Sequence, residues 1–167
     1  MTSSDHPETL SIGLFSAILI CDRVSGAHFN NAVSVAIYFM EGKWKANLKL
    51  FILTNIAEII GALIGATIGS IILPHQNLPV PRRLEGITYF EFFLWEMIGT
   101  FILTAVILNV KYDNNMQQMP ITIKALSVAG TLYFLVHHGA LISSAVYNPC
   151  VGLSLELTAF LRKRILK

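Results

Sequence analysis

The sequence predicts an all-helical (all-α) integral membrane protein with four full transmembrane helices and two re-entrant half-helices that enter the bilayer without crossing it. Three observations predict this fold class. Only 13% of the 167 residues are charged and 54% are hydrophobic, whereas soluble domains carry about 25% charged residues. The apolar residues are gathered into long blocks, and the mean hydropathy is +0.61. Two further apolar segments have about half the length that a bilayer requires, and similar sequences precede them.

The N-terminal part predicts one full span followed by a half-span. An apolar block covers 10–20, and the polar residues before it, together with Pro7, form a helix-start signal, so we expect a helix over about 5–21. A bilayer core of about 30 Å needs about 20 helical residues, which this helix nearly supplies. The next segment, 30–40, is half a span long and ends near Trp44, which lies between lysines as at a membrane interface.

The third apolar block, 48–73, is long enough to cross the bilayer with some tilt. Gly61, Gly65 and Gly69 recur in it at four-residue spacing, which places them on one face of the helix. Such a ridge of small residues lets another helix backbone approach closely. We therefore expect this face to pack against another helix, either of the same chain or of a partner.

The C-terminal part predicts two more full spans and a second half-span. Prolines mark a loop after the third block, and the fourth block follows at 89–110. A polar connector leads to the fifth block at 121–136, which Pro120 opens. The second half-span, 149–161, is followed by basic residues that suit a lipid-headgroup anchor.

Composition narrows the classes of function. No separate soluble domain is indicated, so 1–167 is expected to be one membrane domain with half-repeats at about 5–73 and 87–161. The net charge of +2 comes without the basic stripe that nucleic acid requires. Cys21 and Cys150 lie far apart in apolar surroundings, so neither a disulfide nor a zinc site is expected. With no catalytic constellation, no metal site and no cofactor motif, an enzyme is not expected.

Two nine-residue segments precede the half-spans and resemble each other. Residues 25–33 match 143–151 at four of nine positions, and the segments lie 118 residues apart. Asparagine is a strong helix N-cap and proline suits the first helical position, so each segment can start a helix inside a membrane. Inverted repeats bring such broken helices together near the membrane midplane, where their positive ends repel cations and protons.

These segments resemble the two signature loops of the aquaporin (major intrinsic protein) family. The loop from Ser25 to Asn30 ends in an Asn-Asn-Ala triplet where the family usually has Asn-Pro-Ala, and the second loop has Asn-Pro-Cys. The resemblance covers nearly the whole chain and implies an aquaporin-like helical bundle. It assigns a pore, or the vestige of one, to the two triplets, which consist of Asn30, Asn31, Ala32, Asn148, Pro149 and Cys150.

Two of the spans carry further family matches. The stretch from Glu96 to Thr100 resembles the fourth family segment, whose glutamate hydrogen-bonds the carbonyls of the second signature loop. Glu58 lies in a stretch that resembles the third segment, at a position where glutamine is common. We expect Glu58, Glu96 and His28 to brace the loops. A proton relay through the glutamates is the alternative, since a carboxyl at membrane depth is costly unless it is paired.

Several features of the sequence, including departures from the family pattern, bear on conduction. Val151 replaces the arginine that forms the narrow polar filter in the family, and Asn31 replaces the first proline. His137 and His138 lie near the position of a filter histidine, although an ungapped count places Val136 there and favours interface histidines. The family's first and sixth segments have no counterpart in the sequence, which is expected to leave one side of the pore to be covered by something else.

Two functions are consistent with these features. The first is a non-conducting, degenerate aquaporin-like protein that serves as an accessory subunit of a larger membrane complex. A respiratory or ATP-synthase assembly would be a natural host, in the mitochondrial inner membrane. The alternative is a channel for water or a small neutral solute, completed by a partner chain. Both functions predict a multi-pass integral membrane protein in contact with membrane lipids and other membrane subunits.

Overall fold

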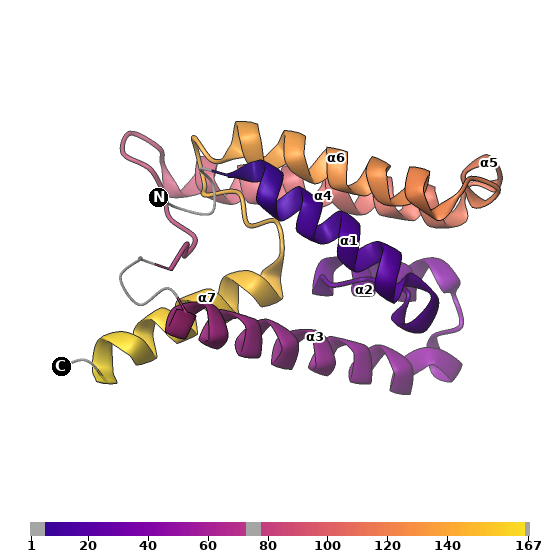
Figure 1. Cartoon of the computed structure of the whole chain (residues 1–167), viewed down its shortest axis with the longest axis horizontal. Coiled ribbons are helices and arrows are strands. Elements are labelled where there is room, and N and C mark those ends of the chain that lie inside the picture. Colours follow the sequence, from indigo (N-terminus) through magenta and orange to yellow (C-terminus); the bar gives the residue numbers. More distant parts are fainter. Residues whose placement is uncertain (1–5, 73–77, 166–167) are drawn as a thin grey trace.

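The computed structural model describes residues 6–72 and 78–165 of the chain. In these two stretches the chain forms seven α-helices and no β-strand (Figure 1). The helices are α1 Pro7–Ser25, α2 Asn31–Glu41, α3 Trp44–Ile72, α4 Tyr89–Tyr112, α5 Asn114–Gln117, α6 Ile121–Gly139 and α7 Pro149–Ile165. The prediction of an all-helical chain is confirmed.

Five helices, α1, α3, α4, α6 and α7, are longer than the segments that the sequence analysis predicted. α1 continues to Ser25 because Gly26 follows in the left-handed conformation (φ 76°), and the Gly26 N–H donates to the Asp22 carbonyl at 2.9 Å. α6 extends past the predicted end to Gly139. α7 has 17 residues because it continues through 162–164, whose basic side chains favour the C-terminal end of the helix dipole. The polar connector before α6 contains the one-turn helix α5.

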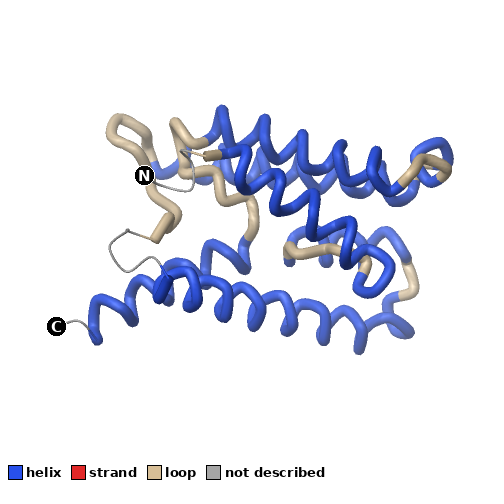
Figure 2. Tube along the Cα trace, in the orientation of Figure 1, coloured by secondary structure: helices blue, strands red, loops and turns tan. Residues whose placement is uncertain are grey.

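The two short helices of the repeat, α2 and α7, begin near the middle of the molecule and run to opposite ends (Figure 1). α6 packs against both α1 and α4, and α3 packs against both α2 and α7. Figure 2 shows α3 running the length of the molecule beside these two helices, with irregular loops leading to their starts. α2 also contacts α7, so the beginnings of the two helices meet inside the fold.

The buried core lies where α1, α4, α6 and the loop before α7 meet. Ile18, Leu103, Val136 and Tyr147 belong to this cluster, and Tyr147 is only 1% exposed. The core therefore joins three long helices to the second copy of the repeat, and it fixes the position of that loop relative to them.

Long apolar faces are left open on the outside of the fold. α3 and α4 are long and apolar enough to cross a membrane. The described positions of α3 include no buried residue, and isoleucines such as Ile64 are more than half exposed. α1 and α6 have 19 residues each, which corresponds to about 28 Å of helix. A contiguous apolar surface of this kind is typical of a protein whose solvent is lipid.

The glycine ridge of α3 lies on this open face. A Cβ atom added at Gly61, Gly65 or Gly69 would meet nothing within 4 Å. Of the two packing partners that the sequence analysis allowed, a helix of the same chain is therefore not found in the described part of the structure.

Candidate pore between the signature loops

Two loops lead into the short helices. The first signature loop (26–30) leads into α2, and the second signature loop (143–148) leads into α7. Residues with positive φ occupy matched positions of the repeat, namely Gly26 and Ser144, Ala27 (50°) and Ala145 (52°), and Phe29 (53°) and Tyr147 (49°). This conformation costs a non-glycine residue roughly 1–2 kcal/mol and persists only where the surroundings hold it. The repeat in the sequence is therefore also a repeat of backbone conformation.

Asn30 and Asn148 join the two loops by reciprocal hydrogen bonds. Asn30 Nδ2 donates to the Tyr147 carbonyl at 2.9 Å, and Asn148 Nδ2 donates to the Phe29 carbonyl at 2.7 Å. Each asparagine thus binds the residue that precedes the other. Asn30 Oδ1 also accepts the Ala32 N–H at 3.0 Å and caps α2. These bonds hold the N-terminal ends of α2 and α7 against each other.

The second triplet starts α7 in a slightly different way. Pro149 is the first residue of the helix, where no N–H donor is needed. The Asn148 carbonyl accepts the Gly152 N–H at 3.0 Å, and the Cys150 thiol donates to Asn148 Oδ1 at 3.0 Å. Cys21 and Cys150 are both free thiols. In the first loop the equivalent oxygen, Asn30 Oδ1, accepts a backbone N–H. In the second loop Asn148 Oδ1 accepts the Cys150 thiol instead.

Glu96, from the first half of α4, binds the second signature loop. Its Oε2 accepts the Tyr147 N–H at 2.8 Å, and its Oε1 accepts the Val146 N–H at 3.2 Å. The family resemblance predicted contacts to carbonyl groups of this loop. The structure has N–H donors instead, because an ionised carboxylate can only accept hydrogen bonds. Two charge-assisted bonds thus hold the part of the loop with unfavourable backbone angles.

Glu58, from the middle of α3, binds the start of α2. Its Oε1 accepts from Ser34 Oγ at 2.6 Å, and its Oε2 accepts from Asn31 Nδ2 at 2.9 Å. Asn31 Nδ2 also donates to Asn55 Oδ1 at 2.7 Å. Asn55 was missed by the sequence analysis, although it lies three residues before Glu58 and therefore on the same helix face. The four side chains form a polar cluster in which the carboxylate has the partners that it needs in an apolar helix.

His28 extends this polar cluster to the C-terminal end of α4. Its Nδ1 lies 3.0 Å from Ser34 Oγ, and its Nε2 lies 3.1 Å from Lys111 Nζ. Because Ser34 donates its hydroxyl hydrogen to Glu58, His28 Nδ1 must carry the hydrogen between His28 and Ser34. The Nε2 atom is then free to accept from the Lys111 ammonium. Four side chains thus form a directed chain of hydrogen bonds from an ammonium group to a carboxylate.

Tyr147 occupies a slot that two glycines leave open. Its hydroxyl donates to the Leu135 carbonyl at 3.1 Å. A Cβ atom at Gly99 would overlap the tyrosine ring, and one at Gly139 would overlap its hydroxyl. The sequence analysis assigned no role to either glycine, although Gly99 lies in the stretch that resembles the fourth family segment. Their close approach to the ring could not be read from the sequence, because the slot forms only when α4 and α6 come together around the second loop.

A cavity of about 850 Å³ runs between α1, α4 and α6 and past both signature loops. Two of the six triplet residues, Asn30 and Asn148, line it. Val136 and Val151, which lie outside the triplets, line it as well. Among the described side chains, no group of three or more His, Cys, Asp or Glu residues is placed to hold a metal ion. Beside the asparagines, the cavity therefore offers a solute amide donors, backbone groups and aliphatic walls.

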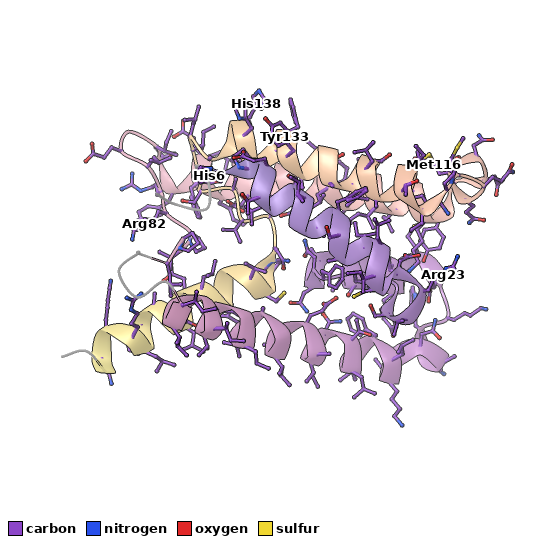
Figure 3. The ribbon with its side chains drawn as sticks, in the orientation of Figure 1. His6, Arg23, Arg82, Met116, Tyr133 and His138 are labelled. Atoms are coloured by element: carbon purple, nitrogen blue, oxygen red, sulfur yellow. The ribbon has the colours of Figure 1, made fainter. Side chains whose placement is uncertain are left out.

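His137 and His138 lie on the outside of the fold. Both are exposed, and they pack on aromatic neighbours, with ring-centroid distances of 5.9 Å from His137 to Tyr133 and 4.4 Å from His138 to Phe134. Figure 3 shows His138 and Tyr133 on the outer side of α6. Val136 faces the cavity instead, at the position that the ungapped count gave. The filter role considered for the two histidines therefore does not hold in this structure, and an interface position fits them.

Comparison with known proteins agrees with this architecture. A sequence profile described as "Major intrinsic protein" matches residues 8–161, which is most of the chain. A "Probable aquaporin AqpM" of Archaeoglobus fulgidus is 31% identical over 108 residues, and this stretch covers 62% of the present chain and 43% of the archaeal protein. The chain therefore spans less than half of the length of that relative. The chain belongs to the major intrinsic protein family, whose members are multi-pass integral membrane channel proteins and not enzymes.

Proposed function

We propose that the chain forms a transmembrane channel for water or a small neutral solute. The cavity that passes Asn30 and Asn148 is the observation that carries this proposal. Each amide nitrogen has two hydrogens, and the opposite signature loop takes one of them. The second hydrogen of each asparagine is available to a solute at the point where the two loops meet. Two donors next to aliphatic walls suit a single-file neutral solute that must exchange hydrogen bonds as it passes.

The proposed membrane placement follows from helix lengths and from the surface of the fold. α1, α3, α4 and α6 cross the bilayer, and α2 and α7 enter it from opposite sides and meet at the asparagines. The chain is then one membrane domain, 1–167, with half-repeats at about 5–73 and 87–161. The open apolar faces of α3 and α4 support this placement, because lipid can cover them. The basic residues 162–164 at the end of α7 suit the headgroup region.

The channel is favoured over the accessory subunit that the sequence analysis put first. The family match supports a channel, and Asn31, one of the departures that suggested a degenerate loop, is held by hydrogen bonds to Asn55 and Glu58. Val151 makes one part of the cavity apolar without closing it. Protein partners and a mitochondrial host membrane stay predictions from the sequence.

Osmotic shrinkage of vesicles that contain the purified protein tests the proposal. Water permeability should exceed that of empty vesicles, and Asn30→Ala should reduce it, because the variant loses the α2 cap and the bond to the second loop. Asn114→Ala removes an exposed asparagine at the start of α5 and is the matched control. Glycerol and urea, tested in the same vesicles, identify the neutral solute. Permeability equal to that of empty vesicles for water and for both solutes would contradict the proposal.

A further inference from the structure

The charged residues that line the cavity all lie at one end of it, which we call its mouth. They are Asp22 near the end of α1, Lys111 in the last turn of α4 and Lys124 in the first turn of α6. This is the end of the molecule at which Figure 3 shows Arg23 and Met116. The opposite half of the cavity is lined by residues such as Val136 and Val151. The cavity is therefore asymmetric, with two ammonium groups and one carboxylate at its mouth.

Lys111 is held against the first signature loop. Its Nζ lies 3.1 Å from His28 Nε2 and would lie 3.6 Å from a Cβ atom at Gly26. The imidazole accepts this bond as a neutral group, because its Nδ1 hydrogen goes to Ser34. The positive charge of Lys111 is thus fixed beside the entrance of the loop without being neutralised there.

Lys124 is also held by an uncharged hydrogen-bond acceptor. Its Nζ donates to the Gln117 carbonyl at 2.9 Å, which is again an uncharged acceptor. A cation near a helix N-terminus opposes the helix dipole, so the position of Lys124 is not one that helix stability favours. Within 6–72 and 78–165, neither Lys111 nor Lys124 forms an ion pair with a carboxylate. Both lysines are half-buried, so solvent screens their charges less than it screens a surface charge.

We propose that Lys111 and Lys124 form a cationic vestibule that excludes cations from the channel. The proposal rests on the proposed function, since it concerns the solutes that the same cavity passes. A cation that enters meets two like charges and one opposite charge, and then the N-terminal ends of α2 and α7, which add positive potential. A neutral solute experiences no comparable barrier. Selectivity for neutral solutes is thus set mainly at this mouth, and the aliphatic half of the cavity contributes shape alone.

Potassium flux into vesicles that contain the purified protein tests the vestibule. The Lys111→Gln/Lys124→Gln variant removes both charges and keeps a polar side chain that is one atom shorter. Its potassium flux should rise at least about tenfold above the wild-type flux, since a barrier lower by about 1.4 kcal/mol corresponds to that factor. Lys111→Arg/Lys124→Arg keeps both charges, and its potassium flux should be as low as that of the wild type. Lys49→Gln removes an exposed lysine of α3 at the same end of the molecule and should also change nothing.

The outcomes of these flux measurements decide whether the two lysines exclude potassium. Potassium exclusion that persists in the double glutamine variant, or potassium flux through the wild type, overturns the vestibule. Lys124→Gln alone gives a second test if the double variant does not fold, because its bond is to a carbonyl in the connector, and its potassium flux should also rise. Water permeability is measured in the same vesicles. A variant that leaks potassium beside a wild type that passes no neutral solute would refute the proposed function and leave the vestibule standing.

Discussion

Asn31 and Glu58 are joined by a hydrogen bond of 2.9 Å from Asn31 Nδ2 to Glu58 Oε2. Each residue departs from the one that is usual in the family, proline at the first position and glutamine at the second. The structure brings the two departures into direct contact, with Asn55 and Ser34 as further partners. The side-chain amide at the start of α2 thus satisfies a carboxylate in the middle of α3.

This contact predicts energetic coupling between Asn31 and Glu58. Asn31→Ala leaves Glu58 with one partner fewer and should lower the free energy of unfolding by about 1–3 kcal/mol. Glu58→Gln should reduce that loss, because a neutral amide in an apolar helix needs its partners less. Unfolding of the single and double variants in detergent measures the coupling, which we expect to exceed about 0.5 kcal/mol. Strictly additive effects would show that the two residues do not act together.

Gly139→Ala should destabilise the fold. The new methyl group would overlap the Tyr147 hydroxyl, and neither the ring nor the backbone of α6 can move without losing the bond to the Leu135 carbonyl. Overpacking of this kind costs about 1–3 kcal/mol or more. Gly130→Ala in the same helix is the control, since a Cβ atom there meets nothing within 4 Å. Thermal unfolding should separate the two variants, and equal melting temperatures would contradict the proposed fit of Tyr147.

Glu96→Gln should disturb the second signature loop while leaving the helices intact. Glutamine offers one acceptor oxygen in place of two, so the Val146 or the Tyr147 N–H loses its partner. The lost bond is expected to cost about 1–3 kcal/mol, and the channel should conduct less water because the loop lines the cavity. Water flux and helix content by circular dichroism are the two measurements. Glu156→Gln, at an exposed position of α7, is the matched control and should conduct like the wild type.

The order of helices and the two loops could be predicted from the sequence because local signals determine them. Asn30 and Asn148 cap or start helices through atoms of their own segments, and the apolar blocks mark the spans. The extra length of α7 was not predicted, because the analysis took hydrophobicity as the helix limit, whereas the basic residues 162–164 continue the helix. The two ends of a helix depend on capping and charge as much as on apolar length.

Contacts between distant segments could not be predicted in the same way. Lys111 and Lys124 belong to different helices, and the sequence analysis assigned neither of them to the pore. Their place at the mouth depends on how the C-terminal end of α4 and the N-terminal end of α6 approach the first signature loop. Likewise, the sequence analysis noted Asn31 as a departure and Glu58 within a family match, and only the packing of α2 on α3 shows that they touch.

A tryptophan placed in the cavity tests most directly whether that cavity is the path of the solute. Val151 lines the cavity at the start of α7, whereas Leu153, two residues later, is 62% exposed on the outer face. Val151→Trp should therefore reduce water permeability to that of empty vesicles, and Leu153→Trp should leave it at the wild-type value. Equal permeability of the two variants, both near the wild type and both fully folded, would contradict a pore between the signature loops.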